Sequence, residues 1–333
     1  MKVALLSYWH AHASIQDARY VKSFLEVPGN EVVCVWDKDY ETAKMWGEHY
    51  GVDYVTDLDK IWERDDVDGV IVTSEPKAHK EIFHAACKHK KHIFTEKVLS
   101  LSLDEALEIE KAVKESGIIF CISFMRLGIK QMVHAKTLLD SGVLGEPVYF
   151  KCMCAHDQGL TGMLPDSWFD PDITGGGAMI DMGFNSTYLA RYIMGGMEGV
   201  STSFAYVTKR VTEDHAVAQV TFKNGALGTL IASFVTPGMS VFELGVYGTK
   251  GSYYTRFNGG KQDAELHLAG KPITVIANDD IPNIIQDPIK TWVKACQENK
   301  PSELYGIDAA VDMVKFMNAA YESNKHGGTR VKI

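Results

Sequence analysis

The stretch VALLSYWHAHASIQDARY, Val3 to Tyr20, passes from an apolar, strand-like run directly into a helical pattern. In chains that bind a dinucleotide, glycines lie at such a junction, because glycine lets the backbone turn tightly and approach a pyrophosphate. This stretch contains no glycine. It therefore predicts a strand followed by a helix, and it raises the question of how a nucleotide would be held there.

The rest of the first third repeats this alternation of short apolar runs and amphipathic helical patterns. The further strand-like runs are EVVCVWD, DGVIVTS, HIFTE and IIFCIS, and the helical patterns cover residues near 15–25, 40–49, 78–88 and 103–115. Each run is almost continuously apolar, as expected for strands that are buried on both faces of a parallel sheet. Residues 1–123 are therefore predicted to form an α/β domain with a doubly wound parallel sheet.

From residue 124 the pattern changes to longer strand-like runs separated by turn signals. These runs are VYFKCMCAH, VSTSFAYVT, AVAQVTF, LGTLIASF and FELGVYG, and helices are expected near residues 129–139, 178–193, 288–298 and 307–323. The pair Asn224-Gly225 between two of the runs is a strong hairpin signal. Residues 124–333 are therefore predicted to form an α+β domain with a large, mainly antiparallel sheet.

Length and charge limit the classes of partner. A chain of 333 residues is long enough for two domains. The net charge of -9 and the scattered Lys and Arg residues leave no broad basic face, so nucleic acid is not expected as a partner. No apolar run approaches the length of a membrane span, and no Cys-x-x-Cys pair occurs among the six cysteines. These features predict a cytoplasmic protein without a membrane partner.

Several short motifs occur in a characteristic order along the chain. They are Asp37 in VWDKD, TSEPKAHKE, Glu96-Lys97 in HIFTEKV, Arg126 in FMRLG, LLDSGVLGEPVYF, GGGAMIDMGFNSTYL, VYGTKGS and YGIDAAVDMVKFMNAAYES. In this order and spacing the chain resembles the Gfo/Idh/MocA family of oxidoreductases over nearly its whole length. The resemblance implies a Rossmann-like N-terminal domain that binds NAD. It further implies a C-terminal domain that binds a sugar, cyclitol or related polyol and forms a homodimer or homotetramer.

The opening stretch departs from the family pattern. Aligned without gaps, Ser7, Trp9 and His12 occupy the glycine positions; alternatively, His12 matches a later family His and the loop is shorter. In both alignments the helix N-terminus remains as an anion site. His10 and His12 are then expected to donate to phosphate, and Trp9 to cover the cofactor. The alternative is that these bulky side chains fill the phosphate site and exclude nucleotide. The His-x-His pair lacks neighbouring carboxylates or cysteines in sequence, so no metal is predicted.

Further cofactor contacts are expected where the strands end. Asp37 closes the second strand, and a carboxylate there accepts hydrogen bonds from the adenosine ribose, which favours NAD over NADP. The adjacent Lys38 leaves NADP open. The resemblance assigns the remaining cofactor contacts to Ser74, Glu75, Pro76, His79, Glu96, Lys97 and Arg126. For His79 the alternative is a polar residue in the first turn of a helix.

The catalytic residues implied by the resemblance are Lys97, Asp181 and Asn185. In the family this lysine lies between nicotinamide and substrate, where an ammonium stabilises the reacting oxygen; here Val98 replaces the usual proline. The family has His, credited with taking the alcohol proton, at the position of Asn185, four residues after Asp181. An amide cannot act as a general base. The candidates for the base are therefore Lys97, then His156, then Asp181.

Three further residues are candidates for substrate binding: His156, Trp168 and Tyr188. Trp168 lies in the loop-like segment 159–172, which either folds over the substrate or forms a rigid surface loop, and Tyr188 is alternatively a core residue. The sequence thus predicts an NAD(P)-dependent dehydrogenase or reductase acting on CH-OH groups. The alternatives are a glycosidase-like member that uses NAD without net redox change and a non-catalytic sugar or nucleotide sensor.

Overall fold

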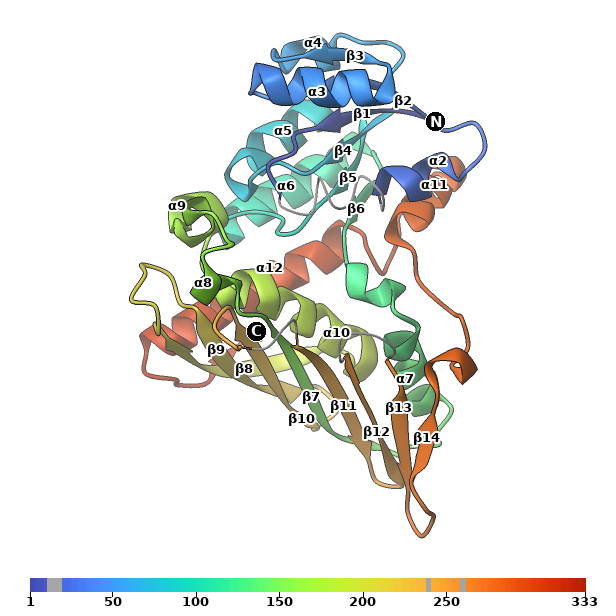
Figure 1. Ribbon diagram of the computed structural model, residues 1–333, viewed down its shortest axis with the longest axis vertical. Coiled ribbons are helices and arrows are strands. Elements are labelled where there is room, and N and C mark those ends of the chain that lie inside the picture. The colour runs from blue at the N-terminus through green and yellow to red at the C-terminus, as the bar shows by residue number, and fades with distance from the viewer. Residues whose placement is uncertain (11–19, 238–240, 258–261) are drawn as a thin grey trace. The chain divides into compact units, whose positions relative to one another are not determined.

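The computed structural model describes residues 1–10, 20–237, 241–257 and 262–333 (Figure 1). The chain divides into two compact units. Unit 1 is Met1–Ser123 together with Asp287–Asp312, and unit 2 is Phe124–Gln286 together with Met313–Ile333. Part of the C-terminal third thus belongs to the first unit. The functional division into a dinucleotide-binding domain of residues 1–123 and a substrate-binding domain of residues 124–333 stays a prediction.

Unit 1 contains a six-stranded sheet in which all strands are parallel, with the order β3-β2-β1-β4-β5-β6. The strands are β1 (Lys2–Leu6), β2 (Glu31–Trp36), β3 (Asp53–Val55), β4 (Gly69–Val72), β5 (His92–Thr95) and β6 (Phe120–Ile122). This order confirms the predicted doubly wound sheet. The strand order reverses between β1 and β4, and doubly wound sheets bind their ligands at the carboxyl ends of the strands beside that point.

The helices of unit 1 that begin at Tyr40, Pro76, Leu103 and Pro288 agree with the sequence pattern to within two residues at both ends, whereas the helix Asp59–Trp62 was not expected. The described helices of this unit are α2 (Lys22–Leu25), α3 (Tyr40–Tyr50), α4 (Asp59–Trp62), α5 (Pro76–Lys88), α6 (Leu103–Ser116) and α11 (Pro288–Glu298). Local sequence sets these limits; for α6, the Ser102 hydroxyl accepts the N–H of Glu105 and Gly117 adopts a φ of 71°. Of the helix expected at 15–25, residues 15–19 lie outside the described part of the chain.

The core of unit 1 includes a helix from far along the chain. Trp292 of α11 is fully buried, and its ring centroid lies 6.2 Å from that of Phe24 and 5.8 Å from that of Phe94. Helix α11 contacts α2, β5 and β6. Residues 288–298 therefore pack beside α2 in the core of unit 1.

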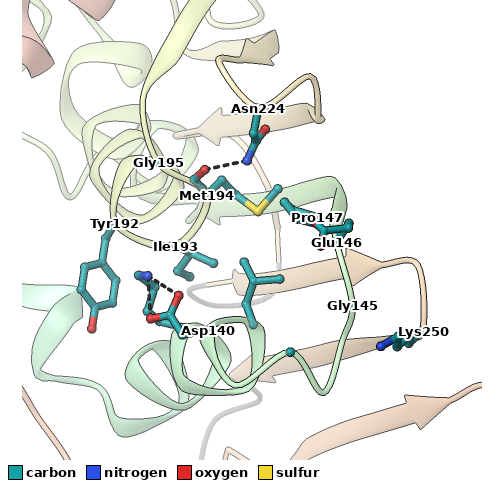
Figure 2. Close-up of a pocket in the computed structure, with 13 residues that line it drawn as sticks. Asp140, Gly145, Glu146, Pro147, Tyr192, Ile193, Met194, Gly195, Asn224 and Lys250 are labelled. Carbon is teal, nitrogen blue, oxygen red and sulfur yellow. Dashed lines mark hydrogen bonds and ion pairs between the residues drawn. The ribbon is translucent and has the colours of Figure 1, made fainter.

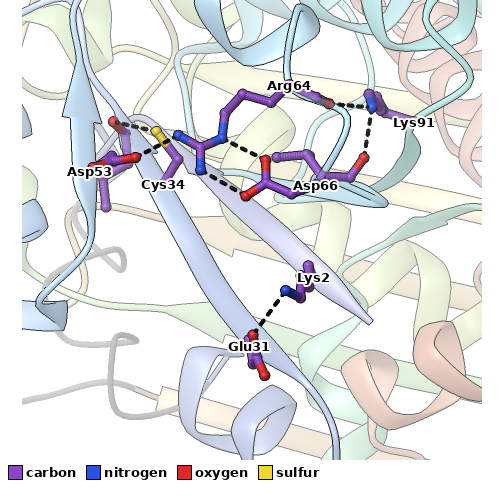
Figure 3. A network of polar contacts seen from close by, with 9 residues as sticks. Lys2, Glu31, Cys34, Asp53, Arg64, Asp66 and Lys91 are labelled. Carbon is purple, nitrogen blue, oxygen red and sulfur yellow. Dashed lines mark hydrogen bonds and ion pairs between the residues drawn. The ribbon is translucent and has the colours of Figure 1, made fainter.

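The amino ends of the strands in unit 1 are held by a polar network (Figure 3). The Arg64 guanidinium donates to both carboxylate oxygens of Asp66, at 2.9 and 2.8 Å, and to Asp53 at 2.8 Å. The ammonium of Lys91 donates to the carbonyl oxygens of Arg64 and Val67 at 2.8 and 2.7 Å. These contacts lie at the amino ends of the strands, opposite the carboxyl ends where doubly wound sheets bind ligands, so they stabilise the sheet away from the expected ligand site.

Unit 2 contains a nine-stranded sheet with the order β14-β13-β12-β11-β7-β10-β9-β8-β15. Its strands are β7 (Pro147–Ala155), β8 (Met197–Ala205), β9 (His215–Phe222), β10 (Leu227–Ser233), β11 (Val241–Gly248), β12 (Gly251–Phe257), β13 (Ala264–Leu268), β14 (Thr274–Ile276) and β15 (Val331–Lys332). Only β7 and β10 pair in parallel among these strands. The five strands expected from the sequence are present, and Asn224-Gly225 lies in the turn between β9 and β10, with a φ of 86° at Gly225.

Helices cover one face of this sheet. The helices and helical turns of unit 2 are η2 (Met125–Gly128), α7 (Lys130–Asp140), α8 (Gln158–Thr161), η3 (Asp166–Phe169), α9 (Pro171–Thr174), η4 (Met179–Gly183), α10 (Phe184–Met194) and η5 (Asn278–Asp280), and α12 (Ile307–Lys325) begins in unit 1. Helix α10 contacts β7 and β10. The one long helix expected at 178–193 is instead a π-helical turn, η4, followed by α10. In the described part of the chain, none of the helices combines the length and apolar character required to span a membrane.

Candidate active site

The carboxyl ends of β1 and β2 in unit 1 meet through Asp37. Its Oδ2 accepts the N–H of Tyr8 and its Oδ1 accepts the N–H of Asp39, both at 2.9 Å. Ser7 has a φ of 67° and donates its N–H to Trp36 O at 2.8 Å. A left-handed residue therefore makes the turn after β1 without glycine. The carboxylate of Asp37 is oriented by two backbone donors, and each of its oxygens keeps capacity to accept another hydrogen bond.

The residues that replace the family's glycines are packed into this edge as far as the structure describes them. The N–H of Trp9 donates to the Ser7 hydroxyl at 3.2 Å, and the indole lies edge-on to the ring of His10, 6.2 Å away between centroids. His10 is buried and its N–H donates to Thr73 O at 3.1 Å. His12 lies outside the described residues. Within residues 1–10, 20–237, 241–257 and 262–333, no three His, Cys, Asp or Glu side chains are grouped to hold a metal ion.

The turn after β4 contains a buried hydroxyl group that has no hydrogen-bond partner among the described residues. The hydroxyl of Ser74 is buried and has no partner among the described residues. The neighbouring Glu75 accepts from the Lys38 ammonium at 2.6 Å, and Pro76 opens α5. Together with the Asp37 carboxylate, an unpartnered buried hydroxyl at this edge fits a bound nicotinamide dinucleotide, whose ribose hydroxyls can meet both groups. Because Lys38 is paired with Glu75, its charge is already balanced.

His79 connects the turns that follow β4 and β5. Its Nδ1 lies 2.7 Å from Val98 O and its Nε2 lies 3.2 Å from Ser74 O. The side chain is completely buried, and this burial lowers the pKa of His79 from 6.5 to about 4. The imidazole is therefore neutral near pH 7 and has one ring N–H, which it can donate to only one of these two carbonyl oxygens; the side chain lies between the turns after β4 and β5, and its described polar contacts are with the protein backbone.

Glu96 forms a second buried connection beneath the same edge. Its carboxylate accepts from the Tyr20 hydroxyl and, at 2.9 Å, from the N–H of Lys97. Tyr20 also shares a hydrogen bond with Ser123 at the end of β6. The peptide bond between Lys97 and Val98 is cis. These two hydrogen bonds of Glu96 hold the turn that carries Lys97 in place.

In unit 2, two of the three consecutive glycines are required by close contacts with the backbone of Glu213 and the side chain of Tyr321. A Cβ on Gly177 would lie 1.9 Å from Glu213 O, and one on Gly176 would lie 2.0 Å from the Tyr321 hydroxyl. The Glu213 side chain accepts the N–H of Gly177 at 3.1 Å, the N–H of Met179 at 2.9 Å and the Tyr321 hydroxyl at 2.7 Å. Burial raises the pKa of Glu213. This carboxylate caps the helical segment that carries Asp181, and the sequence analysis did not identify it.

Asn185, Tyr188 and Arg126 form a chain of hydrogen bonds in unit 2. The N–H of Arg126 donates to the Tyr188 hydroxyl at 2.8 Å, and that hydroxyl donates to Asn185 Oδ1 at 3.0 Å. Asn185 Nδ2 donates to the carbonyl oxygen of Asp181 at 3.4 Å. The guanidinium of Arg126 lies 4.9 Å from the centroid of the Phe242 ring. The structure thus brings three predicted site residues of unit 2 into one network; Tyr188 is buried, and its role in substrate binding stays a prediction.

His156 and Trp168 lie on the segment that follows β7. His156 Nδ1 accepts the N–H of Gln158 at 3.2 Å, so in the neutral imidazole the proton lies on Nε2. Its ring stacks on Phe234, 5.1 Å between centroids. Trp168 is largely buried in η3. The segment 159–172 therefore contains short helices rather than an extended loop.

Unit 2 also contains an open cavity, away from these residues (Figure 2). It has a volume of about 440 Å³ and its lining includes Asp140, Tyr192, Met194 and Asn224. Met194 is the last residue of α10, whereas Asn185 is in its first turn. At ~1.5 Å per residue the two ends of α10 are roughly 14 Å apart. The cavity is thus separate from the Asn185 network.

A doubly wound sheet with Asp37 and the unpartnered Ser74 hydroxyl at the carboxyl ends of its strands, combined with a large antiparallel sheet, is typical of two-part dinucleotide-dependent oxidoreductases. The model of the oxidoreductase family with an NAD-binding Rossmann fold matches residues 12–124, and that of the GFO/IDH/MocA C-terminal domain matches residues 132–254. A curated relative, scyllo-inositol 2-dehydrogenase (NAD(+)) of Bacillus subtilis (strain 168), is 30% identical over 75% of this chain and 70% of its own length. The chain therefore belongs to the Gfo/Idh/MocA family.

Solved structures agree with this membership at the level of the fold. An oxidoreductase domain protein from Kribbella flavida has a TM-score of 0.86 and 23% identity, covering 99% of this chain and 98% of its own. Levoglucosan dehydrogenase in complex with NADH and levoglucosan has a TM-score of 0.86 and 20% identity, covering 100% and 99%. The predicted family, the fold class, the oxidoreductase class and the NAD cofactor are thus confirmed.

Proposed function

We propose that this chain transfers hydride between nicotinamide and a secondary hydroxyl of a sugar, cyclitol or related polyol. The observation that carries the proposal is the cofactor edge of unit 1, where the oriented Asp37 carboxylate and the unpartnered Ser74 hydroxyl fit the riboses of a dinucleotide. The similarity to a scyllo-inositol dehydrogenase supports a polyol as the substrate. NAD, when bound, supplies the acceptor or donor of the hydride.

The residues divide between cofactor and substrate. In unit 1 the proposed cofactor contacts are Ser7, Trp9, His10, His12, Asp37, Lys38, Ser74, Glu75 and Pro76. His79 and Glu96 support this edge through their buried contacts with Ser74 O, Val98 O and the Lys97 N–H. Arg126 remains a proposed cofactor contact, although its described partners belong to unit 2.

Lys97 is proposed to act at the reacting oxygen. Its ammonium can donate to that oxygen and stabilise the negative charge that develops on it. In unit 2, Asp181 and Asn185 hold adjacent oxygens, with Trp168 and Tyr188 beside them. Because the Asn185 amide takes up no proton near neutral pH, the alcohol proton passes to Lys97, to Asp181, or to His156 once its Nδ1 no longer accepts the Gln158 N–H.

NADH formation with scyllo-inositol, myo-inositol and levoglucosan, each with NAD+, tests the proposal. Calorimetry with NAD+ measures cofactor binding separately. Lys97→Ala should lower kcat by at least about 100-fold while leaving the Kd of NAD+ within about threefold. Lys88→Ala, an exposed lysine at the end of α5, is the matched control. Equal loss of turnover and NAD+ affinity would contradict a role of Lys97 at the reacting oxygen.

Two other outcomes would redirect the function. Release of sugar from a glycoside without net NADH formation would favour the glycosidase-like alternative. Absence of heat with either NAD+ or NADP+ would favour the sensor. The homodimer or homotetramer and the cytoplasmic location stay predictions; support for self-association comes from the sheet face opposite α10, where half-buried Tyr149, Ile231 and Tyr247 alternate with core residues.

A further inference from the structure

The Asn185 amide is held in one orientation by its neighbours. A backbone N–H can only donate, so the Tyr188 oxygen is the acceptor in its 2.8 Å contact with the N–H of Arg126. The single proton of this hydroxyl is then donated to Asn185 at 3.0 Å, which identifies the receiving atom as Oδ1. The other end of the amide, Nδ2, faces the carbonyl oxygen of Asp181 at 3.4 Å, and a carbonyl accepts only from a donor. Both contacts require the same orientation.

The Tyr188 ring is itself fixed and cannot easily release this arrangement. It is almost completely buried, stacks on Phe124 with 4.6 Å between centroids and 15° between planes, and meets Phe184 edge-on at 5.9 Å. Rotating the amide by 180° would bring Nδ2 to the Tyr188 hydroxyl, whose proton already points towards it, so two donors would face each other. It would also bring Oδ1 to the Asp181 carbonyl oxygen, so two acceptors would face each other. Two buried hydrogen bonds would be lost.

One hydrogen of Asn185 Nδ2 remains after these contacts. The first is directed to Asp181 O, and no described residue accepts from the second. Asn185 is also 8% exposed, so the amide is not sealed from a ligand. Oδ1 already accepts the Tyr188 proton, whereas Nδ2 keeps a hydrogen that has no acceptor among the described residues, so a ligand that meets Nδ2 meets a donor.

We infer that Tyr188 is a positioning residue that fixes Asn185 as a hydrogen-bond donor, so that the substrate oxygen at this position is bound as an acceptor. This inference rests on the proposed function for the nature of the occupant, a polyol or its keto form. Such an oxygen is a carbonyl, or a hydroxyl that donates its own proton elsewhere. Asn185 then selects substrates by the lone pair they offer and has no part in proton removal.

Two substitutions, one of them isosteric, distinguish a donor from an acceptor at position 185. Asn185→Asp keeps the shape but offers only acceptor oxygens, whereas Asn185→Ala removes the group. If the substrate oxygen is an acceptor, kcat/KM for scyllo-inositol should fall about tenfold in N185A and at least about tenfold further in N185D, since a carboxylate repels a lone pair. If N185D is more active than N185A, the substrate presents a donor and the inference is wrong.

The positioning role of Tyr188 is tested by measuring KM for the polyol separately from kcat and from the Kd of NAD+. Tyr188→Phe retains the packing but removes the proton that orients the amide, so KM for the polyol should rise about tenfold with kcat changed less and the Kd of NAD+ unchanged. Tyr192→Phe, four residues further along α10, is the matched control. A Y188F enzyme with normal KM would overturn the positioning role while leaving the proposed function intact.

The orientation of the amide is also measurable without turnover. In protein labelled with 15N at asparagine side chains, the Asn185 resonance is identified by its loss in N185D. Its Nδ2 protons should show nuclear Overhauser contacts with the Asp181 backbone and weaker ones with the Tyr188 ring. The reverse pattern would overturn the inference. If no polyol reduces NAD+, the proposed function fails, and this spectrum still decides the orientation.

Discussion

The buried imidazole of His79 predicts how unit 1 responds to acid. The structure lowers the pKa of this side chain from 6.5 to about 4 because burial disfavours the charged form. Between pH 6.5 and pH 4 the imidazole of His79 binds a proton in the unfolded chain but not in the folded one. The free energy of unfolding therefore decreases as the pH falls from 6.5 towards 4. At about 1.4 kcal/mol per pKa unit, a shift of about 2.5 units corresponds to roughly 3 kcal/mol.

A comparison of the original protein with the His79→Asn variant isolates the part of the pH-dependent stability that comes from His79. Asparagine can place an N–H near Val98 O but does not titrate, so the variant should be less stable at pH 7 yet lose less free energy on acidification. Urea unfolding followed by circular dichroism at intervals from pH 7 to pH 4 measures both curves. His84→Asn on the same helix is the matched control. If the original protein and His79→Asn lose stability in parallel between pH 6.5 and pH 4, the assigned burial effect is wrong.

Three further substitutions test two regions. Two of them change the contacts of Glu213 in unit 2, and the third changes the Arg64 network at the amino ends of the strands in unit 1. Gly177→Ala should destabilise the protein by about 3 kcal/mol or prevent folding, because its Cβ would lie 1.9 Å from Glu213 O, whereas Gly128→Ala, with open space around it, should change the melting temperature little. Tyr321→Phe should lower the free energy of unfolding by about 1–3 kcal/mol, since the buried Glu213 carboxylate loses its 2.7 Å donor; denaturant titration showing no change would contradict this. Arg64→Ala should cost about 1 kcal/mol and leave the Kd of NAD+ unchanged, because its partly exposed ion pairs lie at the amino ends of the strands; a change in NAD+ affinity measured by calorimetry would refute that separation.

The elements of this fold follow from local sequence to a large extent. The apolar runs of β1, β2, β4 and β5 and the capped helix α6 carry their own signals, and so does Pro288 at the start of α11. The strands β13 and β14 were not predicted from the sequence; they are short, at five and three residues, and only Ala264 among their residues is buried. Their pairing comes from neighbouring strands rather than from their own residues.

The candidate site shows the limit of sequence reasoning more sharply. Glu213 lies 36 residues from Gly177 and 108 from Tyr321, and an acidic residue shortly before a strand gives no sign of such partners. Spacing alone also placed Asp181 and Asn185 in one regular helix, whereas a π-helical turn precedes α10 and the contact of the Asn185 side chain is with the Asp181 carbonyl. The glycine run was visible in the sequence, but its cause is a tertiary contact.

Trp292 also affects the order in which the protein can form during synthesis. Its ring fills the space beside Phe24 and Phe94, so the first unit is unfinished until residues 287–312 have left the ribosome. At ~5–20 residues per second, the interval between the emergence of Ser123 and that of Trp292 is on the order of 10 to 30 seconds. During that time an apolar face of the newly made N-terminal part stays open to chaperones, and nascent chains halted before Trp292 should be far more sensitive to protease than chains halted after α11.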